Sequence, residues 1–169
     1  MLSKIIKYYT KDEFSHISIA LDNELNEMYS FGRLHPSNPF FAGFVHEYIH
    51  MGTFKRFSKT VASVYSIEVT DEQFNRIKSI IKTMKENSKQ YKFNIIGLIA
   101  VGFHIRIKMK NYFYYAEFVK YLLEKSGVNT QLPDIIKPED FKRMKNKQEI
   151  YKGRLQEYSI RTKEIPIGV

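Results

Sequence analysis

The stretch VASVYSIEVTDEQFNRIKSIIKTM, residues 61–84, changes its hydrophobic period part-way along, and this change decides the fold class. Residues 61–69 alternate and are rich in β-branched side chains, which is typical of a strand. Thr70 and Gln73 match a capping box, which marks the start of a helix. The apolar residues that follow at helical spacing are Phe74, Ile77, Ile80, Ile81 and Met84. The stretch therefore predicts a strand followed directly by an amphipathic helix.

Residues 16–31, HISIALDNELNEMYSF, predict a β-hairpin, because one apolar set alternates with a small or polar set before turn residues Asp22-Asn23. The apolar set is Ile17, Ile19 and Leu21, and the other set is His16, Ser18 and Ala20. Residues 33–43, RLHPSNPFFAG, contain two prolines and a glycine and predict a loop.

The second half of the chain adds further helix and strand patterns. Residues 93–103 are apolar and predict a buried helix or strand, between which periodicity does not decide. Residues 116–126 predict a helix that ends at Gly127. A short helix is expected at 138–144, after which a strand is expected near 149–151. We therefore predict an α+β fold in one domain, residues 1–169.

Composition excludes several kinds of site. The 169 residues contain no cysteine, so disulfides, thiolate metal sites and cysteine nucleophiles are absent from this chain. The N-terminal residues show no signal-peptide pattern, and the longest apolar run, residues 93–105, is too short for a membrane span. We therefore expect a cytoplasmic protein.

The formal net charge of +9 is concentrated in the later part of the chain. Residues 61–169 carry 20 Lys and Arg against 12 Asp and Glu, with local clusters at 106–110 and 142–147. Such an excess favours contact with an anionic partner, so nucleic-acid binding is an alternative function to test.

Histidines are the most informative polar residues. His16 lies among small side chains on its predicted strand, where it is either a satisfied, partly buried histidine or a general base. His46 and His50 have the spacing of a helical metal pair, but HEYIH lacks the zincin pattern and a third ligand is not evident. We therefore expect no metal and no cofactor.

Several segments together resemble a Firmicute group of permuted papain-like proteins in the NlpC-type superfamily, distant relatives of the YiiX-like and lecithin:retinol acyltransferase-like proteins. The segments are SHISIAL, NEMYSFGR, NPFFAGFVHE, VYSIEVTDEQFNRI, YKFNIIGLIAVGF, EFVKYLLEKSGV and IIKPEDF, and they cover nearly the whole chain. The resemblance implies an NlpC-type fold in which an antiparallel sheet or half-barrel packs against helices.

The resemblance also implies a catalytic site. In these proteins a nucleophilic cysteine begins a helix in a pattern like C-S-x-F-V, and a histidine from an early strand acts as its base. The pattern falls on Tyr115-Ala116-Glu117-Phe118-Val119, and the histidine is His16. Tyrosine thus stands where relatives keep cysteine, although a slip of one residue would place Ala116 there. A phenol, with a reference pKa near 10, is a far poorer nucleophile than a thiol.

The third member of the site depends on the hairpin register. With a two-residue loop, His16 faces Tyr29 and Glu27 lies beside it; with a three-residue loop, His16 faces Ser30. We favour the longer loop, which also places Leu25 opposite Leu21. Both Glu27 and Ser30 remain candidates, and a solvated strand edge is the alternative.

The expected function is a papain-like hydrolase domain that lacks its cysteine and serves as a binding or regulatory pseudoenzyme. Its ligand would be a peptide, an amide or a lipid acyl group in a cleft. An active hydrolase in which His16 activates water, and a basic nucleic-acid-binding domain, are the alternatives.

Overall fold

A computed structural model describes residues 3–7, 16–35 and 38–158. Its centre is an eight-stranded sheet with the order β7-β6-β4-β3-β2-β1-β5-β8. The strands are β1 (Ser3–Lys7), β2 (Ile19–Ala20), β3 (Met28–His35), β4 (Asn38–Glu47), β5 (Val61–Val69), β6 (Lys92–Phe93), β7 (Tyr112–Phe113) and β8 (Lys147–Arg154). All neighbours are antiparallel except β6 and β7.

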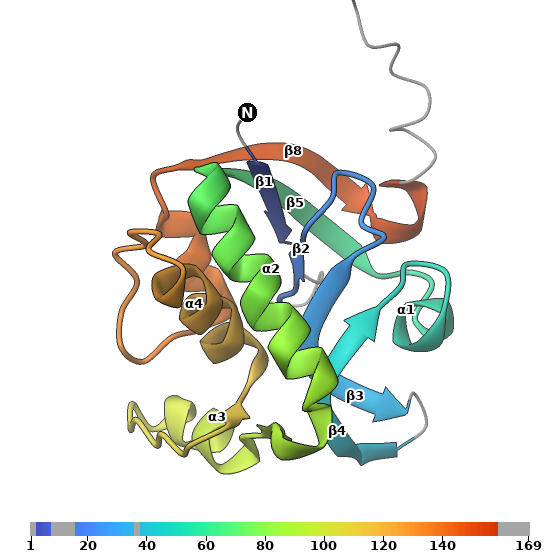
Figure 1. Ribbon diagram of the computed structural model, residues 1–169. Helices are drawn as coiled ribbons and strands as arrows, with labels where there is room; N and C mark the ends of the chain where they lie inside the picture. The colour runs from blue at the N-terminus through green and yellow to red at the C-terminus, as the bar shows by residue number, and fades with distance from the viewer. Residues whose placement is uncertain (1–2, 8–15, 36–37, 159–169) are drawn as a thin grey trace, which may run out of the picture.

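The sheet curls into a half-barrel, and helices pack against it (Figure 1). The helices are α1 (Gly52–Arg56), α2 (Asp71–Glu86), α3 (Ile95–Gly102) and α4 (Tyr115–Lys125), with short 3-10 turns η1 (Ser88–Gln90) and η2 (Pro138–Arg143). The α+β class is confirmed. No helix among the described residues is long and apolar enough to cross a bilayer.

Two buried clusters use alternate residues of the same strands. Ile19 and Tyr29 belong to the larger cluster, which also contains the inner faces of α2 and α4. Ala20 and Met28, their chain neighbours, belong to a smaller cluster with Phe54 of α1. Because successive strand residues point to opposite faces, the sheet is covered on both sides at this point.

The capped helix predicted after residue 69 is confirmed. The Thr70 hydroxyl accepts from the Gln73 backbone N–H at 3.1 Å, and the Gln73 side chain accepts from the Thr70 N–H at 3.0 Å. This reciprocal box starts α2, whose buried face includes Ile77, Ile81 and Met84. The predicted helix of residues 116–126 is also confirmed as α4, and Gly127 ends it with a left-handed φ of 87°.

The hairpin of residues 16–31 is confirmed, but its register differs from both predicted versions. Ile19 pairs with Tyr29 and Ala20 with Met28, so the connection is longer than three residues. The longer turn is stabilised by Asp22, whose carboxylate accepts from two backbone N–H groups, and by Leu25, which adopts a left-handed φ of 59° and is buried. Leu25 therefore does not lie opposite Leu21.

The prediction of a loop over residues 33–43 is wrong. Strands β3 and β4 continue through this segment and pair as far as His35 with Asn38. Pro39 is the second residue of β4, and proline is tolerated at the first residues of a strand because the missing N–H removes little of the strand pairing there.

The apolar segment of residues 93–103 forms mainly the helix α3, and the expectation that it is buried holds for one side only. Gly97, Ala100 and Val101 are buried, whereas Ile95 and Ile99 are more than half exposed. The helix is thus apolar on its outer face as well as on its inner face.

Candidate functional site

A histidine–carboxylate pair lies where the chain enters the β2–β3 hairpin. The His16 Nε2 atom is 3.0 Å from Oε1 and 3.3 Å from Oε2 of Glu47, the last residue of β4. A carboxylate only accepts, so Nε2 carries a proton and donates it to this bond. In the neutral imidazole the lone pair then lies on Nδ1, the atom that accepts a proton when the ring acts as a base.

Glu47 is ionised despite its burial. Only 8% of the residue is exposed. Burial by itself raises the pKa of the Glu47 carboxyl, but the charge of His16, hydrogen bonds from His16 and Ser18, and a weaker polar contact with Ser30 outweigh burial and hold the pKa below its ordinary value. The Ser18 hydroxyl makes a very short hydrogen bond to Oε2. Ser30 Oγ contributes to lowering the pKa, although its geometry falls short of a full hydrogen bond.

Gly32 gives the pair its space. If the hairpin register continues, Ser18 lies opposite Ser30 and His16 lies opposite Gly32. A Cβ at residue 32 would lie 3.3 Å from Ser30 Oγ, 3.4 Å from His16 Cε1 and 3.5 Å from Glu47 Oε1. Small residues on this face therefore leave room for the imidazole and the carboxylate.

Tyr115 meets this pair from the helix side. It is the first residue of α4, and its ring lies edge-on to the His16 ring at a centroid distance of 5.4 Å. The Phe93 ring lies on another side of Tyr115 at 6.5 Å, and the Phe54 ring lies 6.4 Å from His16. Ala116 is fully buried in the larger core cluster. Tyr115, rather than Ala116, is thus the helix-start residue that contacts the histidine.

The start of α4 is electropositive but its tyrosine is not activated. The N-terminus of a helix carries partial positive charge, and the N-cap Tyr114 provides no side-chain cap here. Burial raises the pKa of Tyr115, so the phenol is neutral at physiological pH. Tyr115 therefore contacts His16 through its ring, and its hydroxyl keeps its proton.

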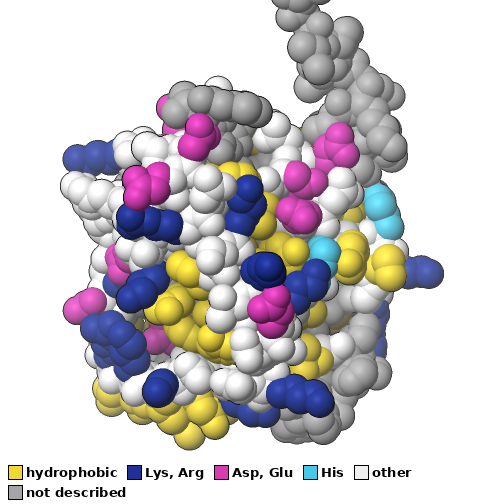
Figure 2. All heavy atoms as spheres, viewed as in Figure 1, with side chains coloured by type: hydrophobic (Ala, Val, Ile, Leu, Met, Phe, Trp, Pro, Cys, Tyr) yellow, Lys and Arg dark blue, Asp and Glu magenta, His cyan; other side chains and the backbone are white. Residues whose placement is uncertain are grey.

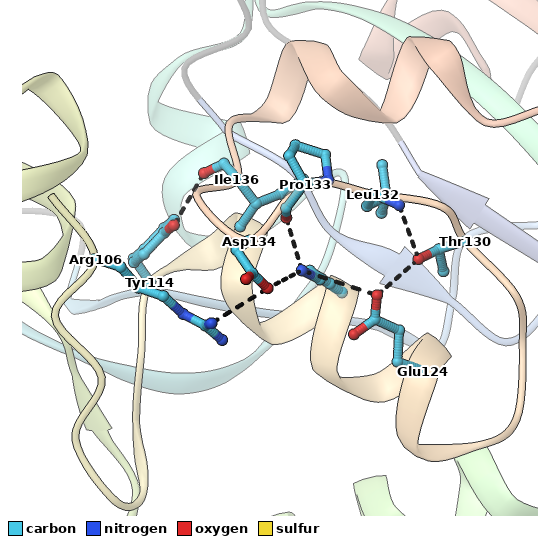
Figure 3. A network of polar contacts seen from close by, with 9 residues as sticks. Arg106, Tyr114, Glu124, Thr130, Leu132, Pro133, Asp134 and Ile136 are labelled. Carbon is cyan, nitrogen blue, oxygen red and sulfur yellow. Dashed lines mark hydrogen bonds and ion pairs between the residues drawn. The ribbon is translucent and has the colours of Figure 1, made fainter. Parts of the chain in front are cut away.

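A polar network fixes α4 in position, as Figure 3 shows. The Tyr114 hydroxyl donates to the Ile136 carbonyl oxygen at 2.9 Å, and Lys120 Nζ donates to the Pro133 carbonyl oxygen at 2.6 Å. Lys120 is buried apart from 8% of its surface and also lies 3.6 Å from an Asp134 oxygen. The segment that follows α4 is thereby tied along the helix, which keeps Tyr115 at the sheet.

The other predicted site residues separate into two groups. Ser30 lies on the same face as His16, next to Glu47, as the favoured hairpin version implies. Glu27 lies on the exposed turn before β3, where its backbone N–H donates to Asp22. The structure thus places His16 next to Tyr115 and on the same strand face as Ser30, while Glu27 lies in the exposed turn.

His46 and His50 do not share a helix. His46 is in β4, where Nε2 donates to the Asn26 carbonyl oxygen at 2.8 Å, and His50 follows in a turn. Within the described ranges, no group of three His, Asp or Glu residues has the geometry to hold a metal ion.

Glu47 is the site residue that sequence reasoning missed. It is the last residue of β4 and carries a buried carboxylate at the end of a strand whose earlier residues are mainly apolar, which is unusual. The sequence pattern placed Glu47 only within HEYIH, and the first part of β4, residues 38–43, was predicted as a loop.

Comparisons with known proteins add no assignment: no protein family, no curated protein and no solved structure matches this chain.

Proposed function

We propose that the protein is a papain-like, NlpC-type hydrolase domain in which tyrosine occupies the nucleophile position, and that it acts as a binding or regulatory pseudoenzyme. Its proposed ligand is a peptide, an amide or a lipid acyl group held next to His16. The proposal keeps the cytoplasmic location expected from the sequence.

One observation carries the proposal: His16 is bound to an ionised, buried carboxylate and contacts the first residue of a helix. A base, an orienting acid and a helix N-terminus are the parts that a cysteine hydrolase assembles around its thiolate. Glu47 takes the role of the orienting acid in this arrangement, and Ser18 and Ser30 hold the carboxylate ionised.

The nature of residue 115 argues against acyl transfer by this chain. The Tyr115 pKa is raised above its ordinary value near 10, so very little phenolate exists at neutral pH. The phenol ring is also much larger than a cysteine side chain, so it takes up space that a carbonyl substrate would need next to a smaller nucleophile. Binding without covalent chemistry is therefore the function that this site supports best.

The test restores the missing group. A Tyr115→Cys variant is assayed with p-nitrophenyl acyl esters and peptide p-nitroanilides, next to Tyr115→Ala, which removes the ring without adding a thiol. We expect turnover or an acyl-enzyme burst with Tyr115→Cys alone, and loss of that activity when His16→Ala is added.

Two outcomes would overturn the proposal. A folded Tyr115→Cys variant that forms no acyl-enzyme with any ester or amide would show that the site is not built for acyl transfer. Turnover by the unaltered chain that disappears in His16→Ala would instead indicate an active hydrolase in which His16 activates water.

A further inference from the structure

Helix α3 presents large apolar side chains to solvent. Ile95, Ile96, Ile99 and Phe103 are 54%, 56%, 61% and 73% exposed, and their spacing places them on one side of the helix. Ile105, two residues further on, is 55% exposed. Figure 2 shows hydrophobic side chains gathered at the lower left, where α3 lies in Figure 1. We call these five residues the α3 apolar surface.

This surface differs from ordinary exposed apolar residues, which are scattered singly. The other large exposed apolar side chains among the described residues are spread over several separate elements: Leu34, Tyr48, Met51, Phe57, Tyr112 and Ile150. The inner side of α3 already packs on the protein through Gly97, Ala100 and Val101. The outer residues are more than half exposed and belong to neither buried cluster of the described residues.

Cations are concentrated in the chain segments that flank the α3 apolar surface. Residues 87–116 contain five Lys and Arg residues and no Asp or Glu. All five have exposed side chains: Lys89, Lys92, Arg106, Lys108 and Lys110. Arg106 also forms an ion pair with the exposed carboxylate of Asp134, with 3.2 Å between Nη1 and Oδ1.

The backbone holds these cations beside the helix. His104 adopts a left-handed φ of 58°, after which the chain turns back from the end of α3. The Asn94 side chain caps the start of α3 and also donates to the Ile107 carbonyl oxygen at 3.0 Å, so the returning loop is tied to the helix start. The Lys92 N–H donates to the Asn111 carbonyl oxygen at 2.9 Å, which closes the excursion.

We propose that α3 and the loop of residues 103–110 form a membrane-contact surface that binds bilayers containing anionic lipids. Exposed isoleucine and phenylalanine side chains gain free energy when they enter the interfacial region of a bilayer. Lys and Arg residues in the same segment attract anionic headgroups. Stable peripheral binding requires two such contributions, and this surface offers apolar insertion together with electrostatic attraction. This inference does not rest on the chemistry at Tyr115.

Charge favours this occupant over a second copy of the chain. A two-fold contact through the α3 apolar surface would bring the two sets of five cations towards one another, and Asp134 beside Arg106 and Glu117 near Arg106 and Lys108 offset them only in part. A nucleic acid would be attracted by the cations, but its phosphates would leave the exposed isoleucines without a partner. An anionic bilayer satisfies both the charge and the apolar side chains.

The test is flotation of the full chain with vesicles of phosphatidylcholine alone or mixed with phosphatidylserine. We expect binding to the mixed vesicles that weakens as salt is added. The double variant Ile96→Asn/Ile99→Asn should bind at least about tenfold more weakly, and Lys108→Glu/Lys110→Glu should lose at least about tenfold on the mixed vesicles.

Matched control variants make the same two kinds of substitution at exposed residues outside the α3 apolar surface. Ile150→Asn changes an exposed isoleucine on β8, and Lys85→Glu changes an exposed lysine on α2. Both should bind as the unaltered chain does, and circular dichroism melting checks that every variant folds.

Three results would overturn the inference. The first is a folded chain that binds neither vesicle at low salt. The second is a dimer in solution that Ile96→Asn/Ile99→Asn dissociates, which would assign the surface to a second copy. The third is vesicle binding that a single-stranded oligonucleotide abolishes and that the isoleucine variants leave unchanged, which would assign the cations to nucleic acid.

Discussion

Replacing Glu47 by glutamine removes the charge of the site while keeping nearly the same shape. In the folded protein the carboxylate accepts from His16 and Ser18 and is almost fully buried. Glutamine retains one acceptor oxygen, but its amide nitrogen would be directed at donors that now lack an acceptor. The substitution therefore tests whether the His16–Glu47 pair is formed as the structure shows it.

The expected loss of stability follows from the bonds removed. A hydrogen bond to a charged group contributes about 1.5–3 kcal/mol, and removal of one partner of a buried ion pair costs about 3–5 kcal/mol. His16 keeps 18% of its side chain exposed, so solvent takes over part of the interaction. Since glutamine also keeps one hydrogen bond, we expect the free energy of unfolding to fall by about 2–3 kcal/mol at neutral pH.

The pH dependence has a definite sign. Because the folded-state pKa of Glu47 is lowered, its carboxylate stabilises the fold at pH values above the ordinary glutamate pKa of about 4.3. This contribution is lost as the pH falls through the lowered folded-state pKa. The difference between the unaltered chain and Glu47→Gln should therefore be complete near neutral pH and shrink in acid.

Urea unfolding followed by circular dichroism measures both quantities. Glu68→Gln is the matched control, because Glu68 is an exposed glutamate on β5, and its free energy of unfolding should change by no more than about 0.5 kcal/mol. A Glu47→Gln variant as stable as Glu68→Gln at neutral pH, or a difference that does not shrink on acidification, would refute the pairing.

Three glycines give further predictions. A Cβ at Gly97 would collide with the Asn94 side chain, so Gly97→Ala should break the α3 cap and lower the free energy of unfolding by about 1–3 kcal/mol. Gly102→Ala is the control, because a Cβ there meets nothing within 4 Å and should be neutral or slightly stabilising. Equal urea midpoints for the two variants would contradict this prediction. Gly32→Ala should crowd His16 and cost about 1–2 kcal/mol, and a crystal structure with an unmoved imidazole would count against the role given to this glycine.

Local sequence patterns predicted α2 and α4 well, whereas α1 was not predicted and α3 was left open between helix and strand. Thr70 and Gln73 specify the start of α2 through bonds made within four residues, and Gly127 specifies the end of α4 by its backbone conformation. Such signals are legible in a sequence because the groups that interact are close along the chain.

The sheet was harder, because strand pairing joins distant residues. The β2–β3 register depends on Asp22 and Leu25, whose turn conformation no short motif announces. The two prolines of residues 33–43 suggested a loop, yet Pro39 lies at the start of a strand, where a proline removes few backbone hydrogen bonds of the sheet. Glu47 is 31 residues from His16 in sequence and 3.0 Å from it in space, and no local pattern joins two residues at that separation.

The site was predicted in part. Strand alternation predicts that His16, Ser18 and Ser30 share one face of the sheet. The observed register differs from the favoured one by two residues, and a change of two residues keeps each side chain on the same face. The meeting of His16 with Tyr115, across nearly 100 residues, came from the family resemblance, since no local rule places a helix start beside a given strand. Exposure of the outer side of α3 was not predicted, because an apolar sequence by itself does not show which side packs.

The most direct test of the central claim is the pH dependence of thiol alkylation in a Tyr115→Cys variant, which contains a single cysteine because the chain has none. Asp71→Cys is the matched control, as residue 71 is likewise the first residue of a helix but belongs to α2. We predict that iodoacetamide reacts with the thiol at residue 115 at a pH well below the ordinary thiol pKa of about 8.5, and that adding His16→Ala returns the titration to that of Asp71→Cys. An alkylation profile at residue 115 that matches Asp71→Cys with His16 in place would contradict the account.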